Sequence, residues 1–249
     1  MKANLLAVAL LVQVLTLPAG ARQVSTLTNA RQLTHFRLTY DRTISDDDAG
    51  RIAKSLERGF EVIHKRLAFA PSRKIPVSLF SSVEKVRSVL RYKVFDDAYF
   101  DDGRIILILP GLQEEGRVLD PAIDRVVARA FTAEIVRCPP WVAEVYSIAA
   151  GYDLARCGSP TRTTIANFSD LGEDLSRADS PDAIRATFAN LGATAKFLVE
   201  RYGDAKMDAL IAQFRAARPV EEAFENAFGE KYSLIEKDWA NYIRSNVRE

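Results

Sequence analysis

The chain has 249 residues, of which 48% are hydrophobic and 27% are charged, with 34 Lys and Arg against 33 Asp and Glu. This length and composition are typical of one large globular domain or two small ones. The sequence carries neither a basic excess nor a polybasic run, which argues against nucleic acid and anionic lipid as partners. We therefore expect no nucleic-acid partner, and consider a protein, peptide or small-molecule partner instead.

The first 21 residues have the pattern of a secretory signal peptide. Lys2 precedes an apolar run from Leu5 to Leu17, and a small-residue triplet ends at Ala21. We expect cleavage after Ala21, leaving a secreted or periplasmic mature chain of residues 22–249. The apolar run is too short to cross a bilayer comfortably, so we expect no membrane span after cleavage.

The next part of the chain, residues 34–118, is predicted to be rich in strands. After a short polar lead, "HFRLTYD" alternates as a half-buried strand does. Ser45 and the acidic run Asp46–Asp48 predict the start of a helix that reaches Leu67. A second strand in "KIPVSLF", a short helix in "SVEKVRSVLRY" and a hairpin that turns at Asp102-Gly103 follow.

From Asp120 onward the hydrophobic pattern becomes helical. Pro139-Pro140 separate one helix from another that begins at Trp141, and a loop is expected over residues 158–169. Further helices are predicted in "PDAIRATFANLGATAKFLVERYG", "DAKMDALIAQFRAA", "PVEEAFENAFG" and "SLIEKDWANYIRS". We expect a single α+β domain over 22–249, with a small mixed sheet and packed helices followed by a helical C-terminal half over about 119–246.

The two cysteines of the chain, Cys138 and Cys157, both lie in the part expected to be exported. An oxidising compartment favours a disulfide between them. Closing a loop of this length would stabilise the folded state by about 3 kcal/mol. A straight helix would hold the two residues apart, so the bridge requires the chain to turn back near Gly151. The alternative is a pair of free thiols.

Six separated pieces of the sequence resemble the peptidase MA-like domain, a gluzincin-type zinc metallopeptidase fold. They are "ERGFEVIHKRL", "YFDDGRIILILPG", "DRVVARAFTAEIV", "PPWVAEVYSIAAGYD", "ATAKFLVERYG" and "PVEEAFENAFGEKYSLIEKDWANYI". The resemblance extends from about Phe36 to Ile243 and depends on the order and spacing of the pieces. It implies a zincin-like α+β fold.

The same resemblance implies that the zinc chemistry of that family is missing from this chain. The family carries H-E-x-x-H on one helix, because two imidazoles four residues apart bind zinc while the glutamate activates water. Residues 129–133 stand at this motif and contain neither histidine nor glutamate, and the chain holds only two histidines, His35 and His64. The third ligand position of the family is matched by Glu144. We therefore predict no cofactor, no metal ligand and no catalytic residue, and a vestigial active-site pocket at Arg129, Ala130, Ala133, Trp141 and Glu144.

The carboxylate of Glu144 needs a partner or water if it faces a vacated pocket. Arg129 stands at the first ligand position, and its fixed positive charge offers an ion pair in place of the metal. The alternative is that both side chains point to water at opposite rims of the pocket.

One strand is a candidate for peptide binding. In metallopeptidases that this chain resembles, the strand corresponding to "GRIILILP" borders the cleft and pairs with extended substrate. Such an edge could accept a peptide by strand addition. The alternative is that five consecutive aliphatic residues are buried on both faces. The residues concerned are Arg104, Ile105, Ile106, Leu107, Ile108 and Leu109.

Taken together, the pattern predicts an exported, non-catalytic peptidase MA-like protein that binds a partner or serves as a scaffold in the cell envelope. One alternative is an active secreted metallopeptidase or other hydrolase with unconventional ligands. A second is that the groove has closed completely and that another surface carries the function.

Overall fold

The computed structural model describes residues 27–87, 97–112, 119–151, 154, 159–160, 167–178 and 180–247. The predicted signal peptide, residues 1–21, and Cys157 lie outside these residues. No helix among the described residues combines the length and the apolar character that crossing a membrane requires.

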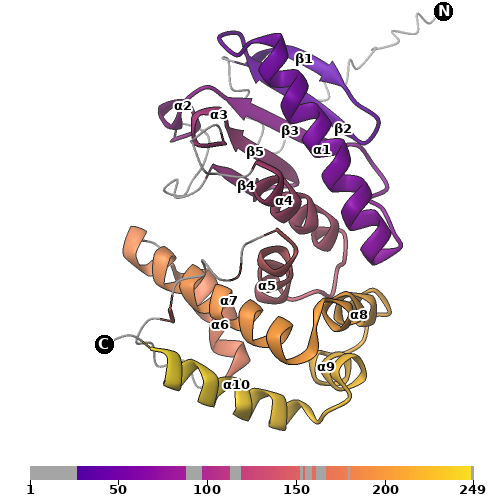
Figure 1. The fold of residues 1–249 in the computed structure, drawn as a ribbon, viewed down its shortest axis with the longest axis vertical. Helices are drawn as coiled ribbons and strands as arrows, with labels where there is room; N and C mark the ends of the chain where they lie inside the picture. The colour runs from indigo at the N-terminus through magenta and orange to yellow at the C-terminus, as the bar shows by residue number, and fades with distance from the viewer. Residues whose placement is uncertain are drawn as a thin grey trace, which may run out of the picture.

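The described strands form one mixed sheet in the order β1-β2-β3-β5-β4 (Figure 1). The strands are β1 (Leu27–Gln32), β2 (Phe36–Asp41), β3 (Ile75–Phe80), β4 (Ala98–Asp101) and β5 (Arg104–Ile108). β2, β3 and β5 run parallel to one another, while β1 and β4 pair antiparallel at the two edges. The chain is therefore α+β, as the sequence predicts.

The helices are divided between the sheet and a separate helical layer. They are α1 (Asp46–Leu67), α2 (Val83–Arg87), α3 (Leu109–Leu112), α4 (Leu119–Ala133), α5 (Pro140–Gly151), α6 (Phe168–Arg177), α7 (Pro181–Tyr202), α8 (Asp204–Arg215), α9 (Val220–Phe228) and α10 (Tyr232–Asn246). α1 and α4 pack side by side on one face of the sheet, and α5 lies between α4 and the helical layer of α6 to α10 (Figure 1). One continuous apolar core runs through both layers.

The strand expected to form the groove edge, Arg104–Leu109, is not an edge strand. β5 pairs with β3 on one side and with β4 on the other, and Leu109 already begins α3. Successive side chains of β5 enter two different apolar clusters: Ile105 joins the main core, and Ile106 joins a smaller cluster with Val86 of α2. The run is apolar because both faces of the sheet are covered, which leaves β4 as the edge strand.

Local signals fix the start of α1 and the hairpin turn as predicted. The Ser45 hydroxyl accepts a hydrogen bond from the backbone N–H of Asp48 at 3.1 Å. At the turn between β4 and β5, Asp102 and Gly103 have φ values of 45° and 75°, the left-handed region that such a tight turn requires.

Three elements were missed in the sequence: β1, the four-residue α3 and α6. β1 lies where only a polar lead was expected. It was missed because its residues are at most half-buried and show no apolar alternation. α6 begins at Phe168, within the expected loop, and its N-terminus is stabilised by a capping box between Asn167 and Asp170. Phe168 and Leu171 are the residues that α6 buries.

α4 and α5 form an antiparallel pair whose backbones nearly touch at Gly151. A Cβ atom placed on Gly151 would lie 2.3 Å from the backbone nitrogen of Arg125 and 2.3 Å from the carbonyl oxygen of Pro121. Only glycine permits this approach, because both neighbouring atoms belong to a helix backbone that cannot rotate away.

We expect Gly151→Ala to lower the free energy of unfolding by about 3 kcal/mol, because the added methyl forces α4 and α5 apart. Gly50→Ala in α1 is the matched control. Its Cβ would meet only the flexible side chain of Arg31 at 3.3 Å, so alanine should be neutral or stabilise by up to about 1 kcal/mol. Urea unfolding measures both. Equal stability of the two variants would contradict the tight contact.

Candidate functional site

Arg129 and Glu144 form an ion pair between α4 and α5. The Arg129 Nε donates to Glu144 Oε1 at 2.5 Å, and the side chains are only 20% and 15% exposed. The predicted ion pair is thus confirmed, and the alternative of two side chains pointing to water is wrong. Because the helices are antiparallel and joined by a short turn, residues 129 and 144 come to the same level of the pair.

The pair has further contacts on both sides. The Arg129 guanidinium lies over the ring of Phe100 in β4, 5.6 Å from its centroid, within the range of a cation–π contact. On the other side, the buried Ser147 hydroxyl donates to the Glu144 carbonyl oxygen at 2.8 Å and lies 3.5 Å from Glu144 Oε2. These contacts fix the two charged side chains from β4 and from within α5.

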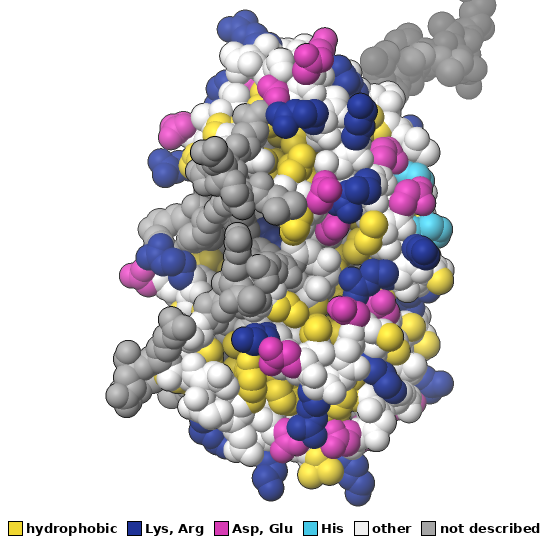
Figure 2. Space-filling model, in the orientation of Figure 1, with side chains coloured by type: hydrophobic (Ala, Val, Ile, Leu, Met, Phe, Trp, Pro, Cys, Tyr) yellow, Lys and Arg dark blue, Asp and Glu magenta, His cyan; other side chains and the backbone are white. Residues whose placement is uncertain are grey.

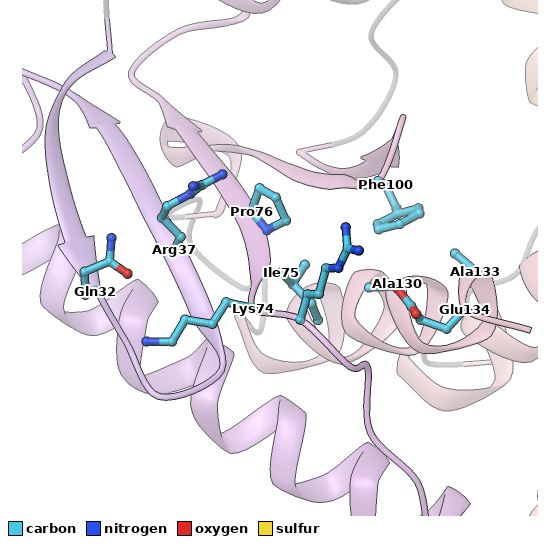
Figure 3. Close-up of a pocket in the computed structure, with 11 residues that line it drawn as sticks. Gln32, Arg37, Lys74, Ile75, Pro76, Phe100, Ala130, Ala133 and Glu134 are labelled. Carbon is cyan, nitrogen blue, oxygen red and sulfur yellow. The ribbon is translucent and has the colours of Figure 1, made fainter. Parts of the chain in front are cut away.

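An open cavity of about 680 Å³ lies beside this pair, between the sheet and the C-terminal end of α4 (Figure 3). The cavity is lined by Gln32, Arg37, Arg73, Lys74, Ile75, Pro76, Phe100, Gly103, Ala130, Ala133 and Glu134. Its volume lies within the range of small-molecule and peptide sites.

Only part of the predicted vestigial pocket borders this cavity. Ala130 and Ala133 of α4 line it, whereas Arg129 of α4 is paired with Glu144 of α5 and neither lines the cavity. Trp141 does not line this cavity. Trp141 is buried in the helical layer, where its ring stacks on Phe168 with centroids 5.3 Å apart.

The cavity is mainly basic on the sheet side. Arg37 belongs to β2, and Arg73 and Lys74 immediately precede β3, whereas Glu134 follows α4. Sequence reasoning missed these residues and Phe100, because they come together only through the strand order. The one available signal was the position of Arg37 on the polar side of an alternating strand.

Side chains that could transfer a proton have other structural roles. His35 Nδ1 lies 2.6 Å from Glu57 Oε2 and its ring stacks on Phe60, while the His64 ring centroid lies 6.1 Å from that of Phe60. The histidines appear at one margin of the surface in Figure 2, and neither lines the cavity. The Thr132 hydroxyl donates to backbone carbonyls of its own helix. Within the described ranges, no three His, Cys, Asp or Glu side chains gather as a metal site requires.

Cys138 is a free cysteine in the turn between α4 and α5, so the structure does not support the predicted disulfide with Cys157. α5 carries the chain about 18 Å away from this turn over its 12 residues, and Cys157 lies outside the described residues. Burial raises the pKa of the Cys138 thiol to about 12, and nearby Arg129 only partly opposes this shift. The reactive thiolate is therefore disfavoured at neutral pH.

Comparison with known proteins gives no match: neither a protein-family model nor a curated protein corresponds to this chain.

We expect Glu144→Gln to lower the free energy of unfolding by about 2 kcal/mol, because the amide leaves a partly buried guanidinium without a counter-charge. Glu200→Gln is the control. Glu200 lies on an exposed helical face, 3.8 Å from Lys196, and its change should cost less than about 0.5 kcal/mol. Chemical unfolding measures both, and equal losses would show that the Arg129 pair adds no stability.

The raised pKa of Cys138 predicts slow alkylation. In the Cys157→Ser variant, Cys138 is the only cysteine of the chain. At pH 8, iodoacetamide should label the native protein at least about 100-fold more slowly than the urea-unfolded protein, because burial disfavours the thiolate. Similar native and unfolded rates, measured by mass spectrometry, would contradict the buried environment.

Proposed function

We propose that this protein is an exported, non-catalytic relative of the peptidase MA-like zinc peptidases, and that it binds a protein or peptide partner in the cell envelope. The observation that carries the proposal is the ion pair of Arg129 with Glu144. In the register of the resemblance, these residues stand at the first and third zinc-ligand positions. The proposal of export rests on the signal-peptide pattern of residues 1–21.

The chemistry of the pair supports a structural role. A catalytic zinc takes three protein ligands and a water molecule, and each ligand must offer a lone pair. A guanidinium has no acceptor and stays protonated, so Arg129 neither binds a cation nor accepts a proton. Ala130 and Ala133 present methyl groups where the general base and the second imidazole would stand. A charge-neutral pair thus takes the electrostatic place of the metal and its glutamate ligand.

Two features support binding. The cavity beside the pair is lined by Ala130 and Ala133, of which Ala133 is exposed, so the place of the missing second imidazole is accessible from outside. β4 is an edge strand with no described strand on its outer side, and its Phe100 lines the cavity. An extended peptide could lie along this edge with a side chain in the cavity.

The test is metal analysis of the purified mature chain, together with a peptide-hydrolysis assay with and without chelator. We expect far less than one zinc per chain and no chelator-sensitive hydrolysis. Stoichiometric zinc, or hydrolysis abolished by a chelator, would favour the alternative of an active metallopeptidase with unconventional ligands.

A restored-motif variant tests the register itself. Arg129→His, Ala130→Glu and Ala133→His together rebuild H-E-x-x-H in α4 and release Glu144 to act as third ligand. We expect this triple variant to bind about one zinc per chain while the parent binds none. A folded triple variant without zinc, as judged by circular dichroism and metal analysis, would show that residues 129–133 do not stand at the metal-binding positions.

A further inference from the structure

We propose that Arg37, Arg73 and Lys74 make the sheet side of the cavity a site for the carboxylate groups of an acidic peptide. This inference rests on the proposed binding function and specifies its ligand. Three observations support it. Arg37 and Arg73 have no counter-charge among the described residues, the three cations come from one end of the sheet, and apolar and acidic groups lie across the cavity.

The charges of Arg37 and Arg73 are not neutralised by other described residues. Arginines elsewhere in the described chain commonly bind carboxylates, as Arg58 does with Asp124 at 2.7 Å. Figure 2 shows the corresponding mixture of both signs over one face of the molecule. In contrast, the side chains of Arg37 and Arg73 have no ion pair or hydrogen bond to a described residue, and Lys74 Nζ donates only to the carbonyl oxygen of Leu33, at 2.6 Å.

The fold brings these cations to one end of the sheet. β2 and β3 are parallel neighbours, and Arg37 is in register with Pro76. Because parallel strands begin at the same edge, Arg37 in β2 lies near the residues that precede β3, Arg73 and Lys74. A concave surface lined by one sign of charge concentrates its field and attracts the opposite charge. Guanidinium groups also bind carboxylates through two parallel hydrogen bonds.

The opposite side of the cavity favours a peptide over a simple anion. Figure 3 shows Arg37 toward one end of the cavity, and Phe100 of β4 with Ala133 and Glu134 toward the other, while the Lys74 ammonium points away from them to the carbonyl oxygen of Leu33. A volume of about 680 Å³ far exceeds a single anion, and the ring of Phe100 offers an apolar contact beyond the cations. Glu134 repels negative charge at that far end. The fitting ligand therefore has carboxylates at one end and an apolar side chain at the other.

Fluorescence anisotropy with three labelled peptides tests this selectivity on the purified mature chain. The peptides share a length and a phenylalanine and differ in a pair of residues, which are two glutamates, two glutamines or two lysines. We expect the glutamate peptide to bind at least about tenfold more tightly than the glutamine peptide, and its affinity to fall as salt is raised. The lysine peptide should bind most weakly.

Charge reversal locates the site. The double variant Arg37→Glu, Arg73→Glu should weaken binding of the glutamate peptide at least about tenfold and remove its preference over the glutamine peptide. The matched control is a single variant, Arg42→Glu. Arg42 is an exposed arginine that pairs with no carboxylate among the described residues; it is placed after the far end of β2, about 16 Å from Arg37, and outside the cavity lining. We expect the control to bind like the parent.

A second variant tests the site without changing either arginine. Ala133→Glu adds a carboxylate to the cavity wall at an exposed helix end, where the fold tolerates it, and should also weaken the glutamate peptide. Equal binding of the three peptides, no binding of any of them, or full affinity in the folded double variant would each overturn the inference. These outcomes are separate from those of the proposed function, because zinc or hydrolysis overturns that proposal whatever the charge preference of the cavity.

Discussion

The close contact between α4 and α5 is the constraint on which the rest of the architecture depends. α4 packs on the sheet and α5 packs on the helical layer, so their contact joins the two parts of the molecule. Gly151 lets the two backbones approach, and the buried Arg125 reaches from α4 to the carbonyl oxygen of Ala98 at 2.5 Å, which ties the same helix to β4. The position of Arg129 relative to Glu144 and Phe100 follows from this arrangement, because all three belong to elements that it holds.

The charged groups of the site fall into two sets, the ion pair between the helices and the charges that line the cavity. Arg129 and Glu144 neutralise each other between the helices and therefore contribute little field to the neighbouring space. The field in the cavity comes from Arg37, Arg73 and Lys74, with Glu134 as the opposing charge. A site that keeps its charged groups paired on one side and unpaired on the other is suited to binding an anion.

The sequence predicts local structure here better than it predicts neighbours in space. Ser45, Asp102-Gly103 and Pro139-Pro140 each act on the backbone within a few residues, and the helix start, the turn and the helix break lie where these residues place them. The ion pair could be proposed because the family resemblance places Arg129 and Glu144 at two ligand positions of one zinc site. Two other features depend on strand order, which no local pattern encodes. These are the position of β5 inside the sheet and the proximity of Arg37 to Arg73. β1 escaped notice for a related reason, because a half-exposed edge strand needs no apolar alternation.

The position of β5 also limits how a peptide can be held. With β5 paired on both sides, strand addition at this end of the sheet is open to β4, which has four residues, while β1 forms the opposite edge. The carbonyl oxygen of Ala98, the first of them, already accepts a hydrogen bond from Arg125. So short an edge offers few main-chain hydrogen bonds, and each contributes little net free energy in contact with water. Affinity for a peptide must therefore come mainly from side-chain contacts, and the unneutralised arginines and Phe100 are the groups that the cavity provides beside this edge.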